Sequence, residues 1–286
     1  MHGNGRRLMK SALKSSDEMK MLALLKEKLA GKPLLPDNEA QWIIDTFIWA
    51  FEHFDGQYFV EQSKVVLPTN EFFPGQVSSI SAMAQQVFHQ VVGFAGMQNW
   101  PIQLVAPQQL SGAHFPTFKF VGQSRGQFAQ LVQPVTQPIL ISFNPAQINQ
   151  PQDLVASFAQ ALAMILIKQK GVLPPGGEAF LPQATDLLAH FLGFGVMLTN
   201  TAYQFRGGCG SCYNPYANRQ AALPETENLM CLALVSTLKG ADRHKISAQL
   251  KPHLRSQYKK AMKQMAEHLA LSPEPVLLAL LEKAGK

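Results

Sequence analysis

The strongest constraint in the sequence is a change of pattern near residue 150. Before it, short β-branched and aromatic runs stand between glycine, proline and polar residues, which is typical of short strands. After it, apolar residues recur at helical spacing over long stretches. The sequence therefore predicts an α+β protein, with a mixed β-sheet in the N-terminal half and a mainly helical C-terminal half.

The individual elements follow from the same periodicities. Strands are expected at 64–67, 102–106, 117–121, 130–135 and 139–143. Helices are expected at 37–54, 79–95, 151–168, 182–203, 225–239, 246–269 and 273–283. With 47% hydrophobic and only 15% charged residues, the chain can bury a large core.

The first residues stand apart from this folded body. Residues 1–32 have the pattern of a mobile or loosely docked helix that ends at Gly31-Lys32-Pro33. We expect a single domain over 33–286, divided into a helix-plus-sheet half at 33–150 and a helical half at 151–286.

Charge and cysteine content bear on location. The most apolar stretch, 156–167, is too short for a transmembrane helix, which needs roughly 20 apolar residues. The beginning of the sequence is charged and lacks the apolar run of a signal peptide. The chain has three cysteines, too few for a disulfide framework. We therefore expect a cytoplasmic protein without a membrane partner.

The densest basic stretch lies at 251–263. Its cationic residues are Lys251, Arg255, Lys259, Lys260 and Lys263. They alternate with apolar residues at helical spacing, and no aromatic stacking platform accompanies them. We interpret them as the solvated face of an amphipathic helix and do not expect a nucleic-acid partner.

The order of elements matches the minimal plan of a zincin. In that plan, the first long helix after the sheet carries His-Glu-x-x-His, whose histidines share one helix face and bind zinc. The glutamate beside the first histidine activates the metal-bound water, and the next helix supplies a third ligand.

Several short motifs stand between residues 34 and 265: Val65-Val66-Leu67-Pro68-Thr69, Phe72-Phe73-Pro74, Leu154-Val155-Ala156-Ser157-Phe158-Ala159, Thr185-Asp186-Leu187-Leu188, Phe191-Leu192-Gly193-Phe194-Gly195, Asn200-Thr201-Ala202, Arg219-Gln220 and Leu223-Pro224-Glu225. Together they resemble an uncharacterised bacterial family of zincin-like, HExxH metallopeptidase-like proteins. The resemblance implies a zincin-like fold, with the site on the helix around 160 and at the start of the following helix.

The ligand positions that this resemblance implies are all substituted. Gln160 and Met164 stand at the two histidine positions, Ala161 at the catalytic glutamate and Pro182 at the third ligand. An amide and a thioether are poor zinc ligands, and alanine cannot accept a proton from water. We therefore expect no zinc chemistry and no cofactor. Met164 is expected to fill the former metal position, with Gln160 hydrogen-bonded nearby.

Two further groups of residues are candidates for chemistry. Asp186 and His190 are one helical turn apart, and we interpret them as a remnant of residues that would orient the metal ligands, or as a local hydrogen bond. Cys209 and Cys212 lie in a glycine-rich loop at a spacing that can chelate zinc or cycle as a dithiol. Because the chain offers no second pair, we favour loop cysteines without a metal, and they remain the weak metal candidates.

These observations favour a catalytically inactive pseudoenzyme that acts as a binding or scaffolding protein. Its expected partner is a protein or peptide in the former substrate cleft. The main alternative is a metal-dependent hydrolase with an altered site, whose ligands would come from Cys209, Cys212, Asp186, His190 or Glu178. A third is a nucleic-acid-associated protein that uses the basic helix at 251–263.

Overall fold

The computed structural model describes residues 33–75, 79–110, 115–202 and 218–285. The chain divides into two compact units, Met1–Leu34 and Leu35–Lys286. The helix expected within residues 1–32 lies outside the described residues. All the described helices and strands belong to the second unit.

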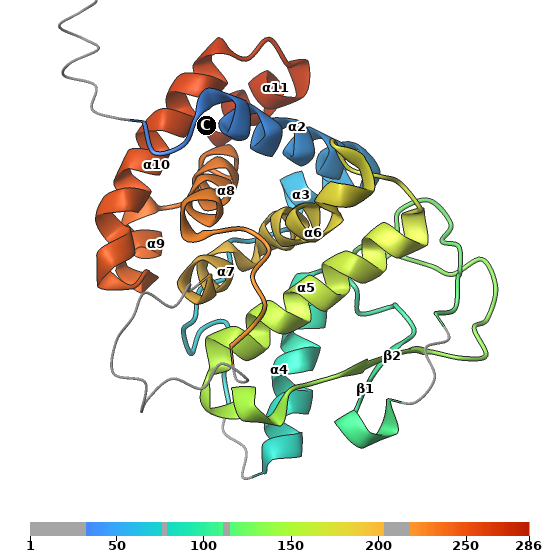
Figure 1. Ribbon diagram of the computed structural model, residues 1–286. Helices are drawn as coiled ribbons and strands as arrows, with labels where there is room; N and C mark the ends of the chain where they lie inside the picture. The colour runs from blue at the N-terminus through green and yellow to red at the C-terminus, as the bar shows by residue number, and fades with distance from the viewer. Residues whose placement is uncertain (1–32, 76–78, 111–114, 203–217, 286) are drawn as a thin grey trace, which may run out of the picture. The chain divides into compact units, whose positions relative to one another are not determined.

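The first half of this unit contains several helices and a small sheet, which lies at the edge of the molecule near α4 and α5 (Figure 1). Its elements are α2 (Asp37–His53), α3 (Gly56–Glu61), α4 (Ile80–Phe94), β1 (Ile102–Val105), η1 (Pro107–Gln109), β2 (Ile139–Ser142) and η2 (Pro145–Asn149). Asp55 adopts the left-handed conformation between α2 and α3, which splits the expected helix 37–54 from a further short helix. Ser79 starts α4 by accepting a hydrogen bond from the backbone N–H of Ala82.

The sheet is smaller than the sequence predicts. β1 and β2 pair in parallel, with Ile102 opposite Ile139. The segments 117–121 and 130–135 meet only through an isolated antiparallel bridge between Phe120 and Leu131. Prolines at 116 and 134 flank this bridge and lack the N–H that a longer ladder needs.

The strand expected at 64–67 is not formed. Instead of joining the sheet, this segment runs along a helix turn, where the Val66 N–H donates to the Gly193 carbonyl at 2.9 Å. The segment is β-branched, as a strand would be, but its hydrogen-bond partner belongs to a helix, which local sequence cannot indicate.

The second half is helical, as predicted, with two breaks in the predicted helices. Its elements are α5 (Pro151–Lys170), η3 (Gly177–Phe180), α6 (Leu181–Ala189), the π-helical turn η4 (His190–Phe194), α7 (Gly195–Thr201), α8 (Glu225–Leu238), α9 (Arg243–Gln249), α10 (Pro252–Leu271) and α11 (Pro275–Ala284). The expected helix 182–203 is interrupted at η4, where Gly193 has φ 107°. The expected helix 246–269 is divided because Pro252 begins α10 and holds the preceding Lys251 out of the helical conformation, with ψ 144°.

α5 and α2 both contact the two halves. α5 contacts α4 on the sheet side and α6 and α7 on the helical side, while α8 packs against α10, α7 and α2 (Figure 1). Buried apolar residues of α5, such as Leu162 and Leu166, are therefore at the centre of the core. Among the helices described, none combines the length and the apolar character of a membrane span.

Candidate functional site

The two helices that the zincin resemblance pairs do lie against each other. α5 contacts α6, and the Gln160 side-chain amide donates to the Asp186 carboxylate at 2.5 Å. The same amide donates to the Gln220 carbonyl at 3.0 Å, so Gln160 is hydrogen-bonded as expected. Met164 and Ala161 are half-buried and Pro182 is exposed, so Met164 is not enclosed as a core residue.

Asp186 is the most heavily bonded side chain of this site and is fully buried. Besides the Gln160 amide, it accepts from the backbone N–H groups of Ala222 and Leu223 at 2.9 and 3.0 Å. A guanidinium nitrogen of Arg219 lies 3.4 Å from its oxygens. These donors occupy both carboxylate oxygens. A buried charge is tolerated only when it is paired and hydrogen-bonded, and Asp186 meets both conditions.

Arg219 fastens the segment before α8 to three helices. Its Nε donates to the Thr201 hydroxyl at 2.7 Å, and a terminal nitrogen donates to the Leu198 carbonyl at 2.8 Å. Its backbone N–H donates to Asp153 near the start of α5 at 2.9 Å. Burial lowers the pKa of Arg219, and the charge of Asp186 opposes that change. The ion pair and these bonds therefore hold the segment before α8 against α5, α6 and α7.

His190 lies one helical turn after Asp186, but its hydrogen bond is to Asn228 and not to Asp186. Its Nε2 lies 2.9 Å from the Asn228 Oδ1. The Asn228 amide nitrogen donates to the Leu223 and Pro224 carbonyls, which fixes Oδ1 as the atom facing the ring. Nε2 therefore carries the proton, and the buried Nδ1 is an acceptor without a partner.

Burial keeps this imidazole neutral. It lowers the pKa of His190 from 6.5 to about 4, against the opposing effect of the hydrogen bond to Asn228. The space beside Nδ1 is closed, since a Cβ on Gly195 would lie 2.6 Å from that atom. His190 is thus a core histidine and not an accessible base.

The π-helical turn η4 gives this region its shape. The Gly193 carbonyl accepts from Val66, and a Cβ on Gly193 would lie 2.2 Å from the Lys64 carbonyl oxygen. Only glycine allows both that close approach and the positive φ. π-helical turns often occur at functional sites, and this one contacts the segment that contains Lys64 and Val66.

The proposed alternative metal ligands are not brought together where the structure describes them. Within that part of the chain, no three His, Cys, Asp or Glu side chains are arranged to hold a metal ion. Glu178 is exposed on η3, while Asp186 and His190 are committed to the bonds above. Cys209 and Cys212 lie outside the described residues. Burial raises the pKa of the Cys231 thiol, as fits a core cysteine.

The basic helix has the solvated face that its sequence predicts. Its cationic residues are all exposed, on α10 or just before it: Lys251, Arg255, Lys259, Lys260 and Lys263. Leu254, Tyr258 and Met265 face the core. Lys263 pairs with Glu267 at 3.9 Å, an exposed contact of little energetic weight.

A polar pocket opens beside the start of α5. It has a volume of about 330 Å³ and is lined from the end of β2, from η2, from α5 and from residues 218–220. Gln147, which lines it, is 3% exposed and has an Oε1 without a hydrogen-bond partner, while its amide nitrogen donates to Ser157 at 3.0 Å. Arg219 and Gln220, which bond Asp186 and Gln160, line this pocket, so it lies next to the α5–α6 site.

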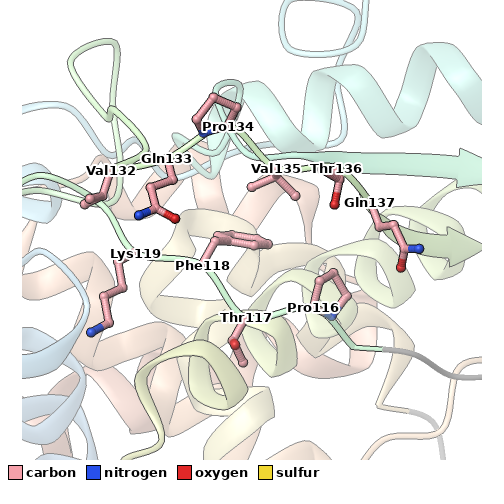
Figure 2. A pocket seen from close by; sticks show the side chains of 10 residues that line it. All are labelled: Pro116, Thr117, Phe118, Lys119, Val132, Gln133, Pro134, Val135, Thr136 and Gln137. Carbon is pink, nitrogen blue, oxygen red and sulfur yellow. The ribbon is translucent and has the colours of Figure 1, made fainter.

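A second, larger hollow lies away from the helix pair (Figure 2). It has a volume of about 460 Å³ and is formed by residues 116–119 and 132–137. Figure 2 shows Phe118 and Val135 pointing toward each other between these two segments. The Gln169 side chain from α5 holds the first segment by bonding the Pro116 carbonyl and the Phe118 N–H. The hollow presents one cation, Lys119, and no group suited to acid–base chemistry.

Two buried arginines have roles that the sequence does not predict. Arg219 is part of a matching motif, yet nothing in its neighbourhood identifies it as the partner of Asp186, 33 positions away. Arg125 is 0% exposed although it stands in a polar, glycine-containing stretch typical of a loop. No local signal predicts its burial.

No protein-family model matches this chain, and no curated protein or solved structure matches it either.

Proposed function

We propose that this chain is a catalytically inactive, zincin-like pseudoenzyme that acts as a binding or scaffolding protein in the cytoplasm. The expected partner is a polypeptide that enters the cleft beside α5.

The observation that carries this proposal is the saturation of Asp186. Hydrolysis at a zincin site needs ligands with free lone pairs and a base beside the metal-bound water. Here Arg219 and two backbone N–H groups occupy the carboxylate, and Gln160 points its amide at it from the position of the first ligand. A polar network of this kind stabilises a helix pair and leaves no group to activate water.

The polar pocket at the end of β2 supplies the binding surface. Gln147, in the wall of this pocket, has a buried, unpartnered oxygen, and leaving such an atom unsatisfied costs about 1–3 kcal/mol. A turn of this side chain toward the pocket would let the oxygen accept from an N–H of an incoming peptide. Neutral amides and hydroxyls dominate the lining, including Asn144, Ser157 and Asn218, so the preferred peptide is polar and uncharged at this point.

The first experiment tests the loss of metal chemistry. Purified protein is analysed for bound zinc and assayed for peptidase activity with and without a chelator. We expect substoichiometric zinc, no cleavage and an unchanged melting temperature, because a native-state metal would add folding free energy that a chelator removes. Stoichiometric zinc with chelator-sensitive cleavage would establish the altered-site hydrolase instead.

The zincin-like geometry has its own test. Restoring Gln160→His, Ala161→Glu, Met164→His and Pro182→Glu together should create zinc affinity if the two helices retain a zincin arrangement. Any one of these substitutions alone should do little, because a single ligand cannot build a three-ligand site. A folded quadruple variant without zinc affinity would show that these positions do not converge.

The second experiment tests peptide binding. An array of uncharged and charged octapeptides is probed with the intact chain and with Asn218→Trp, which fills the pocket without touching Asp186. We expect a subset of polar peptides to bind the natural chain and to lose binding in the variant. Gln130→Trp, at an exposed position outside the pocket, is the matched control. Equal binding by all three proteins would exclude this pocket as the binding site.

A further inference from the structure

A third pocket, separate from the α5–α6 site, gathers cationic side chains. It has a volume of about 370 Å³ and lies between the segment 63–67 and the connection from α8 to α9. Lys64, Lys239 and Lys245 line it, together with Asp242. The volume falls in the range of pockets that hold small molecules.

Lys239 is the most firmly held of these cations. Its ammonium group donates to the Phe59 and Val60 carbonyls at 2.6 and 3.1 Å and lies 5.0 Å from the centre of the Phe59 ring. An ammonium group has three N–H bonds, so one donor remains beyond these two carbonyls. Partial burial lowers the pKa of Lys239, and the charge of Lys283 adds to that effect. A bound anion would relieve both costs.

The lysines lack negative partners. Where the structure describes the chain, none of Lys64, Lys239 and Lys245 forms an ion pair with a carboxylate. Asp242 is the acidic residue of the lining, but one of its oxygens already accepts from the backbone N–H groups of His244 and Lys245. Three ammonium groups and one carboxylate leave the lining with a net charge of +2.

The kind of anion follows from the cations and the walls. The pocket offers ammonium groups and no guanidinium fork, which suits a compact anion with several oxygens better than a planar carboxylate. A phosphate monoester carries a charge of about −1.5 to −2 near neutral pH, which matches the lining. Val65, Leu67 and Ile246 form an apolar part of the wall, where the organic group of the ester can lie.

We infer that this pocket binds a small phosphate monoester, with the phosphoryl group among Lys64, Lys239 and Lys245 and the organic group against the apolar wall. This site is independent of the proposed peptide cleft, since none of its lining residues belongs to that pocket.

Calorimetric titration of the full chain at low ionic strength tests the inference with three probes. Phenyl phosphate supplies a dianion and an apolar body, benzoate the same body with a single carboxylate, and inorganic phosphate the dianion alone. We expect saturable binding of phenyl phosphate in the millimolar range or tighter, weaker binding of inorganic phosphate and the weakest binding of benzoate.

Variants then locate the site. The double variant Lys64→Gln with Lys245→Gln should weaken phenyl phosphate binding at least tenfold, because both ammonium groups are exposed and removable without loss of packing. Lys259→Gln with Lys260→Gln removes the same charge from exposed positions on α10 and should leave binding within about twofold, as expected for charges outside the pocket. Lys239→Met should abolish binding. Because this change takes the donor away from the Phe59 and Val60 carbonyls, the melting temperature of the variant is measured to show that it still folds.

Three results would overturn the inference. They are the absence of saturable phenyl phosphate binding, benzoate binding as tight as that of phenyl phosphate, and equal weakening by the pocket and α10 variants. A single-stranded oligonucleotide that binds through Lys64 and Lys245 while phenyl phosphate does not would likewise replace the small-molecule site with a polyanion surface.

Discussion

The two halves of the folded unit each bury an arginine, and they hold it in different ways. Arg219, in the helical half, lies against the buried carboxylate of Asp186. Arg125, in the half that contains the sheet, is equally buried but bonds neutral oxygens: the Ala95 and Phe54 carbonyls at 2.8 and 3.1 Å and the Ser63 hydroxyl at 3.2 Å.

Aromatic rings complete the surroundings of Arg125. The Tyr58 ring lies 4.5 Å from its guanidinium carbon and the Phe191 ring 5.6 Å. The neighbouring carboxylate, Asp55, accepts instead from the backbone and hydroxyl of Ser124. Burial lowers the pKa of Arg125 to about 10, while Tyr58 and Asp55 oppose the change.

A buried cation can thus be stabilised by neutral hydrogen-bond acceptors or by an opposite charge. The two arrangements should respond differently when one partner is removed. When dipoles hold the cation, its removal leaves only neutral acceptors unsatisfied. When a carboxylate holds it, removal of one partner strands a full charge. Two neighbouring residues of η4 face the two halves. The Phe191 ring lies against Arg125, and His190 bonds Asn228 in the helical half.

The largest effect is expected from Asp186→Asn. This change strands the Arg219 charge in the core and should lower the free energy of unfolding by about 3–5 kcal/mol. Urea denaturation measures it. Combining it with Arg219→Met should cost less than the sum of the two single variants, because the stranded charge is then gone. A loss under roughly 1 kcal/mol would show that the counter-charge contributes little.

Acid should expose the cost of charging His190. The unfolded histidine protonates near pH 6.5 and the folded one only at about 4, so the unfolded state binds more protons in this window. Stability is fully present above pH 6.5 and falls as the pH is lowered toward 4, by about 3 kcal/mol.

The control for this effect is His190→Gln, which keeps a donor for the Asn228 oxygen but does not titrate. The difference between the natural chain and this variant, measured by urea midpoints from pH 7.5 to 4.5, isolates the histidine from Asp186 and other carboxylates. Parallel pH profiles for the two proteins would mean that His190 is not kept neutral by burial.

The Arg125 region should respond less strongly. Arg125→Met removes donors to three buried oxygens without stranding a charge, and we expect a loss of about 2 kcal/mol. Arg125→Lys should not restore stability, because an ammonium cannot span the same acceptors. If Arg125→Met proved more costly than Asp186→Asn, the distinction between dipoles and counter-charge would be wrong.

The contrast between these regions also explains what the sequence could predict. The helices 151–168 and 225–239 and the strands at 102 and 139 follow from local periodicity, and the structure confirms them within a few residues. The resemblance predicts that the helix around residue 160 lies beside the following helix with Gln160 hydrogen-bonded there, but it does not name Asp186 as the partner.

The predictions that failed depend on long-range contacts. Residues 64–67 bond a helix turn that lies far along the chain, and the break at Gly193 accompanies the close approach of the Lys64 carbonyl. Arg125 and Arg219 are buried by partners that no nearby residue indicates. Such contacts are determined by the tertiary fold, so they cannot be predicted from secondary-structure propensity or from the spacing of residues along the chain.

Substitution of Gln160, the residue that bonds Asp186 from α5, should have the smallest effect on stability and also bears on the proposed loss of zinc binding. Gln160→Leu removes two hydrogen bonds of a half-buried amide, while Arg219 and two backbone N–H groups still hold Asp186. We expect a loss of about 1 kcal/mol in the free energy of unfolding and no gain of zinc binding, because the carboxylate stays occupied. Gln160→Glu should cost more, since a second carboxylate would face Asp186, and its cost should grow as the pH rises and the introduced glutamate ionises. Urea denaturation and zinc titration of the two variants decide the matter, and zinc binding by Gln160→Leu would show that Asp186 is still available as a ligand.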